Sequence, residues 1–128
     1  MFSTSQTALE THFQTNYAEN SIEFENEVLN TDGLTEFTRF TVKYAVGKPT
    51  SLGGKCYRYT GAVIIQVFVR PGIGISRSVV LADIISSLYR NNVISGHFFG
   101  VPVITKIAPE STWSQTQVYC EFYFEEYE

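Results

Sequence analysis

The segment from Lys55 to Arg70, KCYRYTGAVIIQVFVR, constrains the fold of this chain more than any other part of the sequence. It reads as one long strand of up to 16 residues. The odd positions from 63 to 69 are all β-branched, and the even positions from 62 to 68 are also mostly apolar. A strand that is apolar on both faces is covered on both faces. Because few segments read as helices, another subunit is the candidate for the second cover.

The length and composition of the chain indicate a single folded domain that spans residues 1–128. Apolar residues make up 44% of the chain and charged residues 17%, which excludes a disordered protein. The first ten residues, MFSTSQTALE, lack the basic start and apolar core of a signal peptide. The longest apolar run, residues 62–69, is too short to cross a membrane, so we expect no membrane association.

Periodic patterns predict the helices and strands. A first helix, capped by Ser3 or Ser5, is expected to run to about Asn16, with an apolar stripe formed by Leu9, Phe13 and Tyr17. A second helix is expected over residues 75–91 and is ended by NNVISG. Strands are expected over residues 21–26, 36–44, 55–70, 101–107 and 112–124, and a loop over residues 47–54. In the last strand we expect these side chains to face the core: Val118, Cys120, Phe122 and Phe124. This order predicts an α+β domain, with a mainly antiparallel sheet of four to five strands and two helices packed on one face.

The charged residues are distributed in three blocks. Residues 1–36 contain seven acids, residues 110–128 contain five, and neither block has a Lys or Arg. All nine basic residues lie between them with one acid, so the blocks carry −7, +8 and −5, which sum to −4. In one interpretation the acidic ends fold back over a basic sheet within a subunit. In the other, an acidic face of one subunit meets a basic face of the next, and such head-to-tail contacts form rings or filaments.

Residues that could support catalysis or cofactor binding are few. Cys56 and Cys120 lack metal-ligand spacing, so we expect two buried thiols, with a disulfide as the less favoured alternative. His12 and His97 have no sequence neighbours that suggest a catalytic triad, so both are interpreted as packing or surface residues. We expect no enzymatic activity, no cofactor and no metal.

Two sequence patterns give weak indications of nucleotide or DNA binding. The turn PGIG, residues 71–74, resembles a phosphate-binding loop, but Arg77 stands where a dinucleotide fingerprint requires its third glycine. We interpret the turn as a structural corner. The basic residues between Arg39 and Arg58 have aromatic neighbours, but the whole chain is acidic, which disfavours direct DNA binding.

Five segments resemble a family of small bacteriophage proteins related to tail terminators. They are SIEFEN, which ends in Glu25-Asn26; EFTRFTV, residues 36–42; SLGGKCYRYTGAVIIQVFVRPGIG; LADIISSLYR, with Ala82-Asp83; and TWSQTQVYCEFYFEEYE. The family often has Trp at the position of Phe37 and Phe at the position of Tyr89. The segment EVLNTDGLT also lacks the proline expected there.

The resemblance implies a structural virion protein without catalytic residues. Such a terminator forms a hexameric ring that caps the tail tube, stops its polymerisation and provides the surface for head joining. The implied partners are further copies of the chain, the tail tube protein and the head–tail connector or stopper protein, and DNA passes through the ring without specific binding. The implied location is the neck end of the virion tail, after assembly in the host cytoplasm. Two alternatives remain: a head–tail connector or minor capsid component, and a small-ligand-binding α+β module, which a deep apolar pocket would indicate.

Ten residues are the candidates for ring formation. The basic block and the doubly apolar strand predict a subunit interface formed by Arg39, Lys43, Arg58, Ile64, Gln66, Phe68 and Arg70. Acids near the end of the chain would face the central hole and repel DNA; the candidates are Glu125, Glu126 and Glu128.

Overall fold

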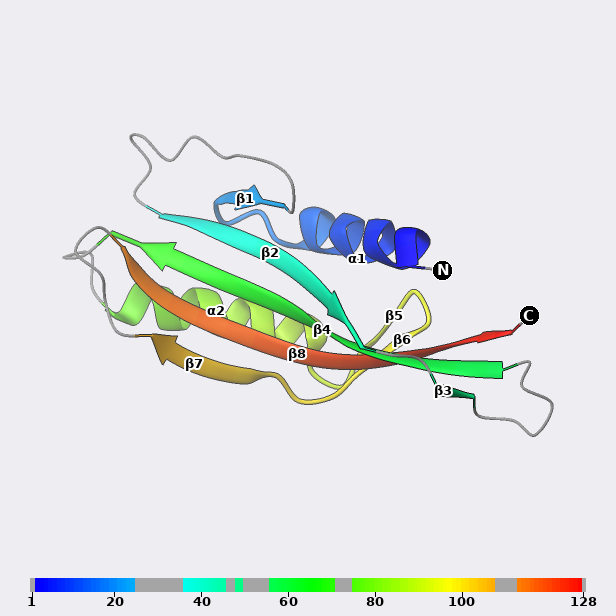
Figure 1. Cartoon of the computed structure of the whole chain (residues 1–128). Coiled ribbons are helices and arrows are strands. Elements are labelled where there is room, and N and C mark those ends of the chain that lie inside the picture. The colour runs from blue at the N-terminus through cyan, green and yellow to red at the C-terminus, as the bar shows by residue number, and fades with distance from the viewer. Residues whose placement is uncertain are drawn as a thin grey trace.

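The structure, a computed structural model, describes residues 2–24, 36–45, 48–49, 56–70, 75–107 and 113–127. It combines two helices with one curved sheet (Figure 1), which confirms the α+β class. The helices are α1 (Phe2–Asn16) and α2 (Ile75–Tyr89). The strands are β1 (Ser21–Glu23), β2 (Glu36–Tyr44), β3 (Lys48–Pro49), β4 (Cys56–Val69), β5 (Val93–Ile94), β6 (His97–Phe99), β7 (Val103–Ile107) and β8 (Ser114–Tyr127). The turn at residues 71–74 lies outside the described residues.

The sheet is built on the long central pair β4 and β8. These strands are antiparallel over 14 residues, from Cys56 opposite Tyr127 to Val69 opposite Ser114. The strand order is β1-β2-β4-β8-β6-β5, while β3 pairs with β4 and β7 pairs with β8. The prediction of one long strand over residues 55–70 is confirmed, since β4 runs from Cys56 to Val69.

The predicted number of strands is wrong, because the described part of the chain forms a sheet of eight strands instead of four to five. The sheet is mainly antiparallel, as predicted, but β1 runs parallel to β2, with Ser21 opposite Phe37. Strands β1, β3, β5 and β6 are only two or three residues long. The alternation of residues 21–26 predicted β1 but not its direction, and the other three strands are too short to show a period.

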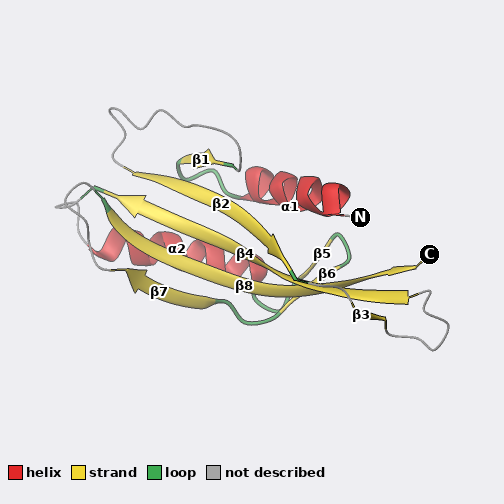
Figure 2. Ribbon diagram, in the orientation of Figure 1, coloured by secondary structure: helices red, strands yellow, loops and turns green. Residues whose placement is uncertain are grey.

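Both helices cover the same face of the sheet, as predicted (Figure 2). The stripe of α1, formed by Leu9, Phe13 and Tyr17, is buried, and the ring of Phe13 stacks on Phe40 of β2 at 5.0 Å between ring centroids. From α2 the buried apolar residues include Leu81, Ala82, Ile85 and Tyr89. They pack against the predicted inner side chains of β8, namely Val118, Cys120, Phe122 and Phe124. The core therefore lies between the helices and this single face.

Two helix boundaries differ from the sequence prediction. Helix α1 already includes Phe2, so Ser5 lies inside the helix and does not cap it. Helix α2 ends at Tyr89 rather than at residue 91, because Asn91 adopts a left-handed conformation with φ of 50°. The expected loop that follows is a short hairpin of β5 and β6, so His97 lies in a strand.

A close approach of three strands requires the glycine at position 61. A Cβ atom there would overlap the backbone oxygen of Lys43 and lie 2.8 Å from the Cζ atom of Phe122. Glycine therefore lets β2, β4 and β8 pack tightly at the point where β2 ends. Beyond it, β4 and β8 continue together to the C-terminal end of the sheet (Figure 1).

Candidate functional site

The face of the sheet opposite the two helices, which we call the open face, is the main candidate site. Among the described elements, no helix covers it (Figure 2). Strand alternation directs the even positions of β4 and the odd positions of β2 and β8 toward this face. Six predicted interface residues therefore belong to it: Arg39, Lys43, Arg58, Ile64, Gln66 and Phe68. The seventh, Arg70, follows β4 and reaches the same face through its contact with Trp113.

Aromatic rings cover one end of the open face. Phe37 and Phe68 stack with their ring centroids 4.6 Å apart, and Trp113 meets Phe37 edge-on at 4.9 Å. The guanidinium of Arg70 lies 3.9 Å from the centre of the Trp113 ring, and that of Arg39 lies 5.1 Å from the centre of Phe68. Phe37 and Phe68 are consequently buried. Part of the cover expected from a second subunit thus comes from within the chain.

The middle of the open face is less protected. Ile64 and Gln66 of β4 are half-buried, as are Gln117 and Tyr119 of β8, which lie directly opposite Gln66 and Ile64. These side chains combine apolar surface with amide and hydroxyl groups. Such a composition suits a contact with another protein surface.

The acidic ends of the chain pair with arginines of the same subunit. The ion pairs are Arg39 with Glu23 at 2.7 Å, Arg58 with Glu125 at 2.7 Å, and Arg77 with Glu36 at 2.7 Å and Glu19 at 3.9 Å. These contacts follow the first interpretation of the charge blocks, in which the ends fold back over the sheet. The charge distribution alone therefore does not require a neighbouring subunit.

The predicted lumen acids differ in their surroundings. Glu125 bonds to Arg58, whose guanidinium also lies 4.6 Å from the centre of the Tyr123 ring. Glu126 belongs to β8, but its side chain and the whole of Glu128 lie outside the described residues. Lys43 is exposed and forms no ion pair with any described residue.

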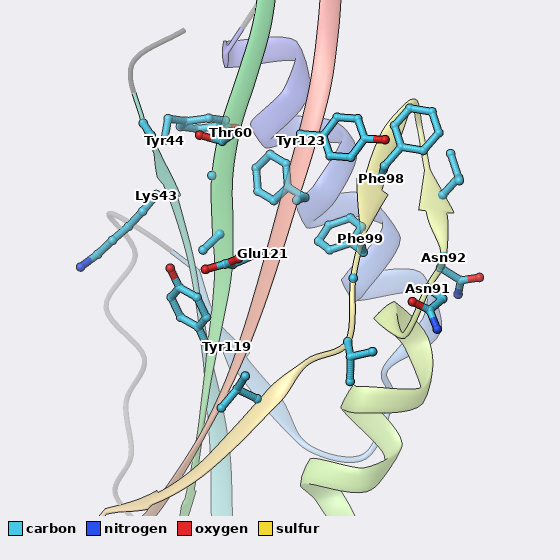
Figure 3. A pocket seen from close by; sticks show the side chains of 18 residues that line it. Lys43, Tyr44, Thr60, Asn91, Asn92, Phe98, Phe99, Tyr119, Glu121 and Tyr123 are labelled. Atoms are coloured by element: carbon cyan, nitrogen blue, oxygen red, sulfur yellow. The ribbon is translucent and has the colours of Figure 1, made fainter. Parts of the chain in front are cut away.

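A hollow of about 990 Å³ opens beside Lys43 (Figure 3). It lies between the C-terminal end of β2, the middle of β4 and β8, and residues 91–93 and 98–103. A bulge lies beside it, because residues 100–102, between β6 and β7, span only residues 120–121 of β8. Most residues that line the hollow are exposed, so it is a broad depression rather than an enclosed pocket. Sequence analysis missed it, although Gly100 and Pro102 together signal an interrupted strand.

Apolar side chains are exposed beside the hollow on β6, on β7 and on the segment between them. The exposed fractions are 43% for Phe98, 64% for Val101, 58% for Val103, 40% for Ile104 and 37% for Ile107. All five residues of β7 are exposed. An edge strand of this kind is a ready site for pairing with another chain.

The buried polar groups have structural roles. His97 is buried, as expected for a packing residue, and its Nε2 atom lies 2.6 Å from the Oγ atom of Ser5. Neither residue lines the hollow, so this serine–histidine contact has no access to a substrate there. Cys120 is a buried free thiol, and burial raises its pKa to about 12, which makes it unreactive. The side chain of Cys56 lies outside the described residues.

Comparisons with known proteins bear on the fold alone. No protein-family profile and no curated protein matches the chain. Among solved structures, 22 chains match. One of them, whose name carries no functional description, has a TM-score of 0.59 and 12% identity, with 96% of this chain and 95% of that chain covered. The whole described architecture thus has a solved counterpart. Neither described helix is long and apolar enough to cross a membrane.

Proposed function

We propose that this protein is a bacteriophage tail terminator, which forms a hexameric ring on the end of the tail tube. The observation that carries the proposal is the open face, which gathers all seven predicted interface residues on a surface without a helix. The resemblance of five sequence segments to the tail-terminator-related family supports the same assignment.

The open face is suited to a head-to-tail contact. It lies on one side of the sheet, and the helices lie on the other, so the two sides of a subunit differ (Figure 2). A contact between the open face and a different surface of the next copy is heterologous, and it closes into a ring when the rotation permits. The half-buried Ile64 and Tyr119 would supply apolar contact at its centre, and Lys43, which forms no ion pair with a described residue, would supply a positive charge at its margin.

The ring would act mechanically. One side would match the last ring of tail tube protein, and the other would fail to reproduce that surface, which ends polymerisation and offers a joining surface to the head–tail connector or stopper protein. Six copies would carry 6 × (−4) = −24 net charge, which disfavours adhesion of DNA that passes through the hole. The protein would reside at the neck end of the virion tail.

One observation favours a second candidate, a small-ligand-binding module. The hollow of about 990 Å³ is large enough for a ligand, and aromatic residues such as Tyr119, Phe99 and Tyr123 line it. Ligand sites, however, bury about 70–90% of a drug-sized ligand. A depression whose lining is mostly exposed fits a protein contact better, and a head–tail connector or minor capsid component would use the same surfaces.

A phage in which this gene is disabled tests the proposal. The expected particles are filled heads and separate tails that are overlong or ragged under negative stain. Addition of the purified protein to such tails should produce ends of uniform length and restore joining. Normal, joined particles without the protein would refute the terminator assignment.

A further inference from the structure

Strand β7 is an edge strand that the described fold leaves uncovered. Among the described residues it pairs with β8 alone, and all five of its side chains are exposed. Figure 1 shows it at the margin of the sheet. Val103, Ile104 and Ile107 make this edge apolar, and Lys106 is its single charge. Natural proteins normally protect such an edge with proline, charge or a covering segment.

The sequence of β7, VITKI, is complementary to itself in one antiparallel register. Full overlap of two copies places Thr105 opposite Thr105 on a two-fold axis. Val103 of each copy then lies opposite Ile107 of the other copy on the open face. Ile104 of each copy lies opposite Lys106 of the other copy on the helix face. Apolar pairs and Thr–Thr pairs stabilise adjacent strands, and no two like charges are opposed in this register.

We propose that two copies of the protein pair through β7 in this register and form a symmetric dimer in solution. The two sheets become continuous, and the two open faces lie side by side. An isologous contact of this kind uses the same patch on both subunits. It therefore differs from the head-to-tail contacts of the proposed ring, and it goes beyond that proposal.

The dimer protects the apolar edge before the protein reaches its place of assembly. Its contact is small, since only five residues of each copy pair, and small interfaces are typical of weak, reversible complexes. The dimer is therefore expected to dissociate on dilution. A strand of an unrelated partner could also pair with β7, and cross-linking of the purified protein separates that outcome from self-pairing.

Cross-linking tests the register. In a Cys56→Ser background, Thr105→Cys places two thiols directly opposite each other, at a Cα separation of about 4.5–5.5 Å that suits a disulfide. Mild oxidation of the purified protein should give a species of 2 × 14.5 = 29.0 kDa on a non-reducing gel. The matched Lys106→Cys variant should run as a monomer on the same gel. Its thiol lies opposite Ile104 of the other copy in the proposed register, so the two thiols do not form a disulfide. Equal cross-linking of both variants, or of neither, would overturn the register.

Charged substitutions of Thr105 test the pairing without a disulfide. Thr105→Lys and Thr105→Glu each oppose like charges on the two-fold axis, so each protein alone should remain a monomer in analytical ultracentrifugation. An equimolar mixture should regain the dimer, with a dissociation constant at least about tenfold lower than that of either variant alone. Failure of the mixture to associate would refute β7 self-pairing. Neither result depends on tail assembly, so this test and the phage test can fail independently.

Discussion

The Nε2 atom of His97 lies 2.6 Å from the Oγ atom of Ser5, which joins β6 to α1 across 92 positions of sequence. The Nδ1 atom of His97 lies 3.0 Å from the backbone oxygen of Ile94, an atom that only accepts hydrogen bonds. Nδ1 therefore carries a proton, and in the neutral ring Nε2 accepts from the Ser5 hydroxyl. The hydroxyl of Tyr44 donates in turn to Ser5 at 3.0 Å. Burial of the ring favours this neutral form.

Stability should fall in mildly acidic solution because of this imidazole. Burial lowers the pKa of His97 below its ordinary value of 6.5. The unfolded chain therefore binds more protons than the folded one in the window below pH 6.5. The stabilisation by neutral His97 is complete above pH 6.5 and is lost as pH falls toward the pKa of His97 in the folded protein. The free energy of unfolding then changes by at most about 1.4 kcal/mol per pH unit for this one group. Urea denaturation between pH 7.5 and 5.0 measures this slope.

A second histidine provides the comparison. Burial also lowers the pKa of His12, which lies on α1 with its ring 5.8 Å from that of Tyr89. His97→Gln and His12→Gln should each reduce the slope, and the double variant should be nearly independent of pH in this window. A slope that survives both substitutions would contradict the assignment.

The ion pair between Arg77 and Glu36 should stabilise the fold measurably. The guanidinium makes two hydrogen bonds to the carboxylate, at 2.7 and 2.9 Å, and the Glu36 side chain is only 15% exposed. These bonds join the first turn of α2 to the start of β2. Since Arg77 itself is partly exposed, Arg77→Lys is expected to reduce the free energy of unfolding by about 1 kcal/mol, through loss of the paired geometry.

The stabilisation by the Arg77–Glu36 ion pair also depends on pH. The hydrogen bonds from Arg77 lower the pKa of Glu36 below its ordinary value of 4.5. Its stabilisation is complete above pH 4.5 and is lost as pH falls toward the folded pKa. A double-mutant cycle with Glu36→Gln and Arg77→Lys at pH 7 and pH 3 isolates the coupling, which should be smaller at pH 3. Equal coupling energies at the two pH values would argue against the charged pair.

Long periodic segments were predictable from the sequence. The stripe of Leu9, Phe13 and Tyr17 and the alternation around Val118 and Phe122 identified α1, β8 and their buried sides, because burial of one face imposes these periods directly. The two-sided apolar pattern of β4 also indicated a partly covered second face, where Phe68 is buried.

The remaining features depend on contacts between distant residues. The hairpin β5–β6 is too short for a period, and the hollow lies beside a register mismatch between residues 100–102 and β8. Ser5 matches the sequence pattern of a helix cap, whereas its actual role depends on His97, 92 positions away. The aromatic cover of the open face likewise requires Trp113 to meet Phe37 across the folded sheet. A single sequence does not encode such pairings in local patterns.

Gly61→Ala should destabilise the protein. The added methyl group would meet the backbone oxygen of Lys43, which cannot move away as a flexible side chain could, and it would lie 2.8 Å from the Phe122 ring. Overpacking of this kind costs about 1–3 kcal/mol. Gly100→Ala is the matched control, because no atom lies within 4 Å of the place that its added methyl group would take, and its stability should be nearly unchanged. Thermal unfolding of both variants measures the difference, and similar melting temperatures would contradict the close approach of the strands.

The open face should control assembly on the tail. Ile64→Glu places a charge at the half-buried centre of this face, opposite Thr41 and Tyr119 and away from the core. Because the side chain projects opposite to the helices, the variant should fold, with a loss of stability below about 2 kcal/mol. A buried, unpaired carboxylate in a ring contact would cost several kcal/mol, so the variant should fail to cap tails in extracts that lack the native protein.

Val80→Glu separates this effect from a general effect of added charge. Val80 is 48% exposed on α2, on the opposite side of the sheet, and the substitution adds the same carboxylate to an apolar position. Val80→Glu should cap tails as the native protein does, and circular dichroism should show that both variants are folded. If Ile64→Glu also capped tails normally, the ring would not be held by the open face, since no apolar contact at that position could tolerate six buried charges.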